Sequence, residues 1–497
     1  MKPRLLLRLA GILVMLYAAQ ASAADTSLTA AQAKSDAAIL VKTMRALHPA
    51  LDKYRSPAEV DAAFARFTAR AEQARSAAAM YLAATELAAA IRCGHTWTNV
   101  LNQQGPIKAR LLDTADKLPL TMTLVDGRWR VLASATPGIT ANDEIIAIDG
   151  RSSAAVVATM LPYLRADGSS DGKRLRQLGH DRPDFSMMDI VWPLLAPPGE
   201  GRFQLQVRSG DGVVRTVAAP ATTLAARAAS LKAQGVASID ASWRLRIDGD
   251  LAVLTLPTFA FYRSKFDWRG FMAESFATLR QRQIGRLVID IRDNEGGDGE
   301  IGLELLSWLV KSPVTYVSDQ SVTTYERVPY ALARYLDTWD YGFFDRTGQV
   351  DPIVDGPQKG RLRFRPNAAK VHQVTPRENG YQGSSWLLVG AENSSATFAL
   401  AQLVQQSGAA TLVGQKTGGN ARGLNGGQLT WVNLPHSGVA VDIPLLASSY
   451  GVDTPDASVI PDIVVQRSFE RQVAGRDEEM ETVKALIAGQ ITAPAKP

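Results

Sequence analysis

Ser395 is the residue best placed for nucleophilic chemistry. It lies in Gly390-Ala391-Glu392-Asn393-Ser394-Ser395-Ala396, between an apolar run that predicts a buried strand and a run that predicts a helix. The first N–H groups of a helix have no partner within it, and they stabilise a nearby negative charge. The N–H of Ala396 is therefore a candidate donor to an oxyanion formed by attack of Ser395. The competing interpretation is that Asn393, Ser394 or Ser395 only caps the helix.

Gly296 and Gly297 end a second segment that favours chemistry, VIDIRDNEGG from Val288. Paired glycines after a strand let backbone approach a ligand closely, so either glycine is a candidate second oxyanion donor. Gly297 to Gly302 also spells GxGxxG, a dinucleotide-binding pattern. Arg292 to Glu295 stand between strand and glycines, which argues against the tight turn that holds a pyrophosphate.

His95 is the candidate general base. It is one of five histidines and follows a long predicted helix. An imidazole with a pKa near neutrality is suited to take a proton from a serine, although a purely structural histidine is the competing interpretation. His436 is a reserve candidate for the base. The histidines lack the spacing of metal ligands, so we predict no metal and no organic cofactor.

Three further patterns have a bearing on the chemistry. Ser170-Asp171-Gly172-Lys173 spells SxxK, but its Asp-Gly step predicts a solvated loop, whereas SxxK requires a helix. No GxSxG surrounds Ser395, which disfavours an ordinary α/β-hydrolase. Cys93 is the only cysteine, which excludes an intramolecular disulfide. We expect Cys93 to be a buried small apolar residue and not a nucleophile.

The leader and the composition define the protein class. Residues 1–23 combine a basic start, an apolar run and small residues, which predicts a secretory signal peptide and a bacterial periplasmic location without stable membrane insertion. The 497 residues are 46% hydrophobic and 21% charged, typical of a globular protein of several domains. Without the leader, the chain has 51 basic and 49 acidic residues, which gives a net charge of +2. This small charge indicates no nucleic-acid partner.

Four segments follow the leader. Residues 24–115 are alanine-rich and predict two or three helices, and residues 116–240 predict a small β-rich region. Residues 241–470 alternate strands and helices, which predicts an α/β core with parallel strands, and 471–497 predict a helix and a tail. Residues 325–383 carry no readable motif. The core is expected to contain strands at Leu251–Leu256, Arg286–Ile291, Trp386–Gly390 and Thr411–Gly414, helices at Gly270–Gln283, Glu300–Val310 and Ala396–Gln406, and a β-rich return at Leu429–Val432 and Val439–Ile443.

Six motifs in order give the sequence a family resemblance. It resembles the tail-specific, or carboxy-terminal processing, serine peptidases and their relatives, the tricorn protease core and the interphotoreceptor retinoid-binding protein modules. The resemblance covers about Asp36 to Val465. It implies an α/β fold with a crotonase/ClpP-like core, a helical N-terminal region and a PDZ-like insertion. The motifs are Cys93-Gly94-His95-Thr96, ITANDEIIAIDG from Ile139, VIDIRDNEGG, VGAENSSATFALAQLV from Val389, LVGQKTGG from Leu412 and VIPDIVV from Val459.

The resemblance implies that Ser395 is the nucleophile, with Ala396 and Gly296 or Gly297 as oxyanion donors. In tail-specific members a lysine stands 25 residues after the serine, and this chain has Asn420 there, with Lys416 displaced by four residues. The tricorn-like branch uses an N-terminal histidine, which matches His95.

That branch also has a serine before the histidine and a distant glutamate. This chain has Gly94 in place of the serine, and Asp453 or Asp442 is the candidate for the glutamate. Without an orienting group the imidazole tautomer is less well fixed.

The sequence as a whole predicts an exported serine peptidase. Ser395 would attack a peptide bond of an unfolded or C-terminal protein segment, with His95 as base. The PDZ-like stretch would bind an extended chain by strand addition. The alternative is a catalytically degenerate binding protein of the same fold for a peptide or apolar ligand, because fold alone does not fix function. The sequence leaves the oligomeric state open.

Overall fold

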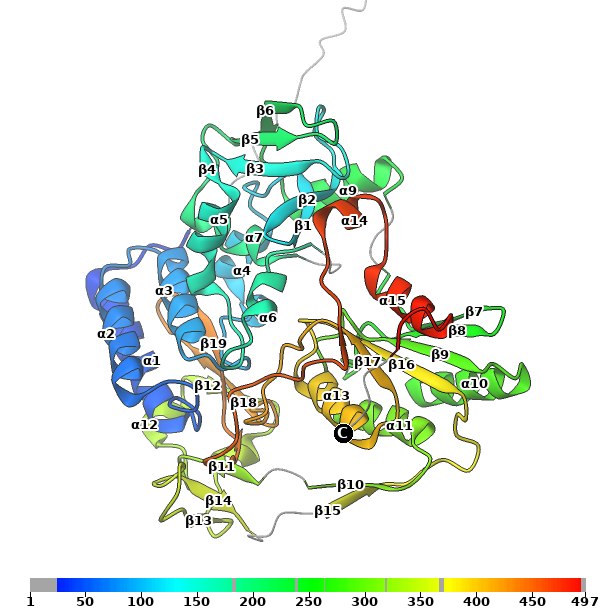
Figure 1. Ribbon diagram of the computed structural model, residues 1–497. Coiled ribbons are helices and arrows are strands. Elements are labelled where there is room, and N and C mark those ends of the chain that lie inside the picture. Colours follow the sequence, from blue (N-terminus) through cyan, green and yellow to red (C-terminus); the bar gives the residue numbers. More distant parts are fainter. Residues whose placement is uncertain are drawn as a thin grey trace, which may run out of the picture.

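The computed structural model of the protein describes residues 25–180, 185–236, 240–262, 264–317, 320–365 and 371–492. The predicted signal peptide, residues 1–23, lies outside these ranges. The described chain forms five β-sheets and surrounding helices, as Figure 1 shows. None of its helices combines the length and the apolar character that crossing a membrane requires.

The N-terminal region is helical, as predicted. Three long helices pack in sequence, and Thr29 and Ser56 begin the first two with capping boxes, in which a Gln or Glu side chain binds back to the cap. The alanine-rich sequence favours helix and lets the helices approach closely. These elements are α1 (Ala30–Leu47), α2 (Pro57–Glu72), α3 (Ala77–Ala90), the 3₁₀-helix η1 (Val100–Asn102) and α4 (Gly105–Leu112).

An antiparallel sheet of order β1-β2-β3-β5-β6, with β4 paired to β3, follows. Its last two strands form an antiparallel pair within the predicted β-rich region, and assignment of this sheet as a PDZ-like module stays a prediction. The strands are β1 (Leu120–Val125), β2 (Arg128–Ser134), β3 (Glu144–Ile148), β4 (Arg151–Ser152), β5 (Arg202–Arg208) and β6 (Val214–Pro220). The helices beside them are α5 (Ser153–Met160), η2 (Leu161–Tyr163), α6 (Asp171–Arg176), α7 (Met187–Ile190), α8 (Trp192–Leu195) and α9 (Leu224–Ala233).

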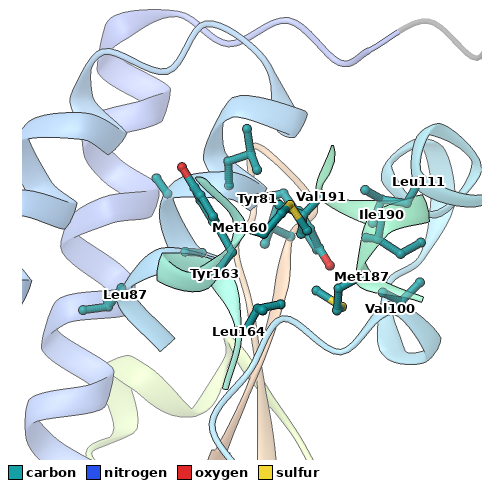
Figure 2. Close-up of a cluster of buried hydrophobic side chains, with 14 of the residues drawn as sticks. Tyr81, Leu87, Val100, Leu111, Met160, Tyr163, Leu164, Met187, Ile190 and Val191 are labelled. Carbon is teal, nitrogen blue, oxygen red and sulfur yellow. The ribbon is translucent and has the colours of Figure 1, made fainter. Parts of the chain in front are cut away.

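One hydrophobic core joins the helical region to this sheet. Figure 2 shows part of it, where Tyr81 of α3 lies among Met160, Ile190 and Val191 from the second region. The cluster also contains Val441 of a later hairpin. The segments 24–115 and 116–240 therefore pack around a shared core.

The predicted parallel α/β core is present. Its sheet has the order β21-β17-β16-β9-β8-β7, with parallel pairing throughout except at β7. Leu287 and Ile289 face the layer of α10, α11 and α13, while Val288 faces α15 on the other side. This two-sided burial explains why the strands are continuously apolar. The elements are β7 (Arg244–Asp248), β8 (Leu251–Thr255), α10 (Trp268–Gln281), β9 (Arg286–Asp290), α11 (Gly299–Leu309), β16 (Ser384–Val389), α13 (Ser395–Ser407), β17 (Thr411–Gly414), β21 (Ile463–Val464) and α15 (Glu478–Ile487).

Residues 325–383 contribute short strands to three small sheets. One of these sheets contains the predicted β-rich return, the hairpin of β18 (Leu429–Asn433) and β19 (Ala440–Pro444), together with β12 (Leu336–Asp337). The other elements are β10 (Val314–Val317), β11 (Ser321–Thr323), α12 (Tyr330–Ala333), η3 (Tyr341–Phe344), β13 (Val350–Pro352), β14 (Leu362–Phe364), β15 (Val371–Val374), β20 (Ala447–Ser448) and α14 (Phe469–Val473).

A buried ionic cluster links α7 to α9. The Arg227 guanidinium donates two hydrogen bonds to the Asp189 carboxylate, at 2.6 and 2.8 Å, and His180 Nε2 lies 3.1 Å from the same carboxylate. Burial alone would raise the pKa of Asp189, but His180 and Arg227 together hold that pKa well below its ordinary value. The cluster is stable only while both charges are present, because either charge alone would be buried without a partner.

We predict that Asp189→Ala lowers the free energy of unfolding by about 3–5 kcal/mol, since it leaves the Arg227 charge buried and unpaired. The control is Asp61→Ala, which breaks the exposed Arg45–Asp61 pair and costs less than about 1 kcal/mol. Urea unfolding of the two variants measures the difference. Equal losses would contradict this account of the buried cluster.

Candidate active site

Ser395 is the first residue of α13, directly after the turn that leaves β16. Its φ of +51° is unusual for a residue other than glycine and is maintained only where the surrounding structure enforces it. The Asn393 side chain donates to the backbone oxygens of Ile291 and Asn294, which ties this turn to the end of β9. No side chain caps α13, so the interpretation that these residues only cap the helix is wrong.

Two backbone N–H groups beside Ser395 have no acceptor among the described residues, those of Ala396 and Gly297. The N–H of Gly296 instead donates to Asn294 Oδ1 at 2.9 Å. Gly296 packs so closely that a Cβ added there would lie 2.9 Å from Ser395 Cβ. Of the two predicted glycine donors, Gly297 is therefore the one whose N–H is available, and Gly296 provides the close approach.

His95 lies in the segment after α3, and its neighbours fix that segment at two points. Thr96 Oγ1 hydrogen-bonds to the buried His48 Nε2 at 2.7 Å. Trp97 forms a two-way backbone bridge with Asp442 of β19. Cys93, just before, is buried as predicted. The segment is thus anchored between the helical region and the β18–β19 hairpin.

The surroundings of His95 keep its imidazole neutral. Burial lowers the pKa of His95 and outweighs Asp167, which raises it. Arg165 and Lys173 lower this pKa further, and Glu295 opposes them. The Nδ1 atom is buried and has no hydrogen-bond partner in the described structure. Gly426 packs against the other nitrogen, since a Cβ there would lie 2.4 Å from Nε2. A neutral imidazole has the protonation state of a base.

His95 and Ser395 line the same cavity of about 710 Å³. Gly296 and Gly297 also line it. No hydrogen bond joins His95 to Ser395 within the described ranges. The structure therefore brings the predicted nucleophile, base and glycines to one cavity, and leaves the proton-transfer contact unformed.

A chain of charged groups connects the two sides of this cavity. Arg165 donates to the backbone oxygen of Gly94 and, at 2.8 Å, to Glu295 Oε1. Lys173 Nζ donates to the same Glu295 oxygen at 2.9 Å and also to Ser394 Oγ. The neighbours of His95 and of Ser395 are thus linked through one carboxylate.

Lys173 corrects an expectation from the sequence. Ser170–Lys173 was expected in a solvated loop, but Asp171–Arg176 form the short helix α6 and Lys173 is buried. The Asp-Gly step predicted a turn, whereas Asp171 here occupies the first turn of α6. The SxxK spelling was the signal that pointed to Lys173, although the lysine contacts Ser394 and not a serine of its own motif.

The structure separates the two candidate acidic groups. Asp442 is buried at the cavity, where burial raises its pKa to about 6 against the opposing hydrogen bonds from Asn102 and Asn99. Asp453 is exposed and does not line the cavity. The structure thus does not bring Asp453 to His95. Within the described residues, Asp442 forms no hydrogen bond to the imidazole either, and Asn99 and Asn102 donate to its carboxylate instead.

The alternative bases lie elsewhere. Asn420 donates to Asp456 Oδ1 at 2.6 Å and does not line the cavity. Lys416 and His436 are exposed, away from the cavity lining. Of the bases considered from the sequence, only His95 reaches the cavity.

Asp167 explains why glycine precedes His95. Its Oδ1 accepts from the Gly94 N–H at 2.8 Å, and a Cβ at Gly94 would lie 2.6 Å from Oδ2. The carboxylate fills the space of a side chain at position 94. Sequence reasoning did not find Asp167, Arg165, Glu295 or Gly426, because each acts through a long-range contact with no local pattern.

Comparison with known proteins places these observations in a family. Residues 250–465 match the family model described as Peptidase family S41. A crystal structure of a CPAF mutant aligns with a TM-score of 0.64 and 13% identity, covering 93% of this chain and 97% of CPAF. Mature CPAF complexed with lactacystin aligns with a TM-score of 0.61 and 16% identity, over 92% and 98% of the chains. At these identities the likeness shows a shared fold. No curated protein matches the sequence.

We predict that Gly297→Ala slows the reaction of Ser395 with a fluorophosphonate probe by at least about 100-fold, the cost of losing one oxyanion donor. Position 297 has a φ of +137°, and an added Cβ would lie 2.2 Å from the Phe259 carbonyl carbon, so the backbone must move. Gly299→Ala is the matched control, because a Cβ there meets nothing within 4 Å. Probe labelling followed by mass spectrometry measures both rates, and equal rates would exclude Gly297 as a donor.

Proposed function

We propose that the protein is a serine peptidase with Ser395 as nucleophile and His95 as general base, because residues 250–465 match the model of peptidase family S41. The observation that carries the proposal is the shared cavity. It places the imidazole on the same surface as a serine held at a φ of +51° beside two free N–H groups. A strained serine, a neutral base and unpaired donors are the parts that acyl transfer requires.

The proposed reaction has two stages. His95 Nε2 takes the Ser395 Oγ proton as Oγ forms a bond to the peptide carbonyl carbon, and the resulting oxyanion accepts from Ala396 and Gly297. The C–N bond then breaks, and the imidazolium gives its proton to the leaving amine. Water, deprotonated by the same imidazole, hydrolyses the acyl-enzyme and restores Ser395. Because the Ser395–His95 hydrogen bond is absent from the described structure, substrate binding has to tighten the site.

The proposed substrates are peptide bonds in unfolded or C-terminal protein segments, reached after export to the periplasm. The cavity is large enough for several side chains of an extended chain, and a strand of the antiparallel sheet β1–β6 is the proposed site of strand addition. Asp442, at the cavity, is the acidic group retained in this proposal, while Asp453 has no support from its exposed position.

A degenerate binding protein is the second candidate, and one observation favours it. His95 Nδ1 is buried without a partner, so nothing in the described structure fixes the imidazole tautomer. Loss of the group that orients the histidine can reduce the catalytic rate of a serine peptidase by orders of magnitude. A protein with this defect would retain the cavity as a ligand site.

We predict that a fluorophosphonate probe labels Ser395 in the purified protein and that Ser395→Ala abolishes labelling. His95→Ala is expected to slow labelling by at least about 100-fold, since general-base assistance contributes that much. Ser407→Ala, in the last turn of α13, is the matched serine control and leaves labelling unchanged. A wild-type protein that resists the probe but binds a peptide or lipid would support the binding protein instead.

We predict an acidic limit to the reaction that lies below the ordinary histidine pKa of 6.5. Burial lowers the pKa of His95, so the imidazole stays neutral below pH 6.5, and the labelling rate falls only as pH drops through that lowered pKa. Asp442, with a pKa raised to about 6, is the other group at the cavity that titrates in this range. The limit should therefore persist in Asp442→Asn. If the acidic limit of the labelling rate disappeared in Asp442→Asn, the limit would belong to Asp442 and not to His95.

A further inference from the structure

We propose that Lys173 is a positioning residue for the reaction at Ser395. Its ammonium holds the strip Glu295–Gly297 against the start of α13, and so fixes the Gly297 N–H relative to the Ala396 N–H. This inference rests on the proposed function. It assigns to the site a lysine from α6, outside the matched residues 250–465.

The contacts of Lys173 join the two strips that flank the oxyanion donors. Its Nζ donates to Glu295 Oε1 at 2.9 Å and to Ser394 Oγ. Ser394 Oγ donates in turn to the backbone oxygen of Glu295 at 3.1 Å. Glu295 is followed by Gly296 and Gly297, and Ser394 by Ser395. One ammonium therefore contacts both Glu295, the first residue of this strip, and Ser394, the residue before α13.

The strip that Lys173 holds would not be rigid by itself. Gly296 and Gly297 have φ values of +121° and +137°, in a region where only glycine is relaxed. Glycine also has the greatest conformational freedom to lose, so external contacts must define where the Gly297 N–H lies. The backbone of Phe259 supplies contacts on one side, since its N–H donates to the Gly296 oxygen at 3.0 Å and its oxygen accepts from the Asp298 N–H at 2.9 Å. The Glu295 side chain, bound by both Lys173 and Arg165, supplies the contacts at the start of the strip.

The lysine stem is itself held tightly. A Cβ at Gly418 would lie 2.9 Å from Lys173 Cδ and 3.0 Å from its Cβ, and 2.2 Å from the backbone oxygen of Ala391. The side chain of Lys173 is only 2% exposed. Burial of an ammonium is costly without partners. The packing beside Gly418 holds the Lys173 stem so that its ammonium contacts Glu295 and Ser394 and is shielded from solvent.

Loss of Lys173 should therefore affect the chemical step more than binding. The Gly297 N–H would become less well placed toward the oxyanion, and misplacement by about 1 Å can cost about 100-fold in rate. We expect the maximal rate of Ser395 labelling to fall by about 10- to 100-fold in Lys173→Met. The probe concentration at half-maximal rate should change by less than about threefold, because the amides act mainly in the transition state.

The test compares three variants in the full-length protein. Lys173→Met removes the ammonium, and Lys173→Arg keeps a buried cation that can donate to both acceptors. Lys117→Met is the matched control, because Lys117 is equally buried and pairs with Asp116, and neither residue lines the cavity. Urea unfolding and saturation kinetics with a fluorophosphonate are measured for each. The expected result is slow labelling in Lys173→Met, recovery to within about fivefold of wild type in Lys173→Arg, and wild-type labelling in folded Lys117→Met.

Two outcomes would overturn the inference. Lys173→Met that labels at the wild-type maximal rate would show that the lysine has only a structural role. Equal slowing in Lys117→Met would show that any buried lysine has this effect. If Lys173→Met does not fold, Ser394→Ala serves as the second variant, because it removes only the hydroxyl contact. We expect Ser394→Ala to slow labelling by about threefold to tenfold. Labelling of Ser394→Ala at the wild-type rate would contradict the proposal. Failure of the wild-type protein to label would instead overturn the peptidase itself.

Discussion

The carboxylate of Glu295 is the group through which the two sides of the site are connected. Arg165 links it to the backbone of Gly94, beside His95, and Lys173 links it to Ser394, beside Ser395. Both cations lower the pKa of His95, whereas the carboxylates of Asp167 and Glu295 raise it. The charged neighbours of His95 thus oppose one another, and burial is the largest cause of its lowered pKa.

The local geometry around Ser395 follows from the parallel sheet. β9 and β16 are neighbours and parallel, so the loops at their carboxyl ends meet at one edge. Asn393 and Asn294 then bond across the two loops, and Gly296 supplies the space for Ser395. A serine at a helix start and a glycine pair after a neighbouring strand become one site because of this adjacency.

The sequence predicted these local parts well, because each has a local cause. The strands of the core are apolar on both faces, and β17 begins and ends at the predicted residues. Ser395, Gly297 and His95 carried motif and context signals, and all three reach the cavity. The long-range parts were harder. Asp167 beside Gly94 and Gly426 beside His95 come from distant segments, and the SxxK turn was misread because an Asp-Gly step also fits the first turn of a short helix.

His95 and Ser395 lie beside different hydrophobic cores. Cys93 and Val100, on either side of His95, pack in the core of the helical region, whereas Ala396 and Phe398 of α13 pack in the core of the parallel sheet. During synthesis the chain emerges with His95 first and Ser395 three hundred residues later. The core around His95 also contains Val441 of β19, which is synthesised after Ser395, so this core cannot be completed before the serine has been made. We therefore expect the proposed hydrolytic centre to assemble only when nearly the whole chain is present, which would protect neighbouring proteins from an unfinished enzyme.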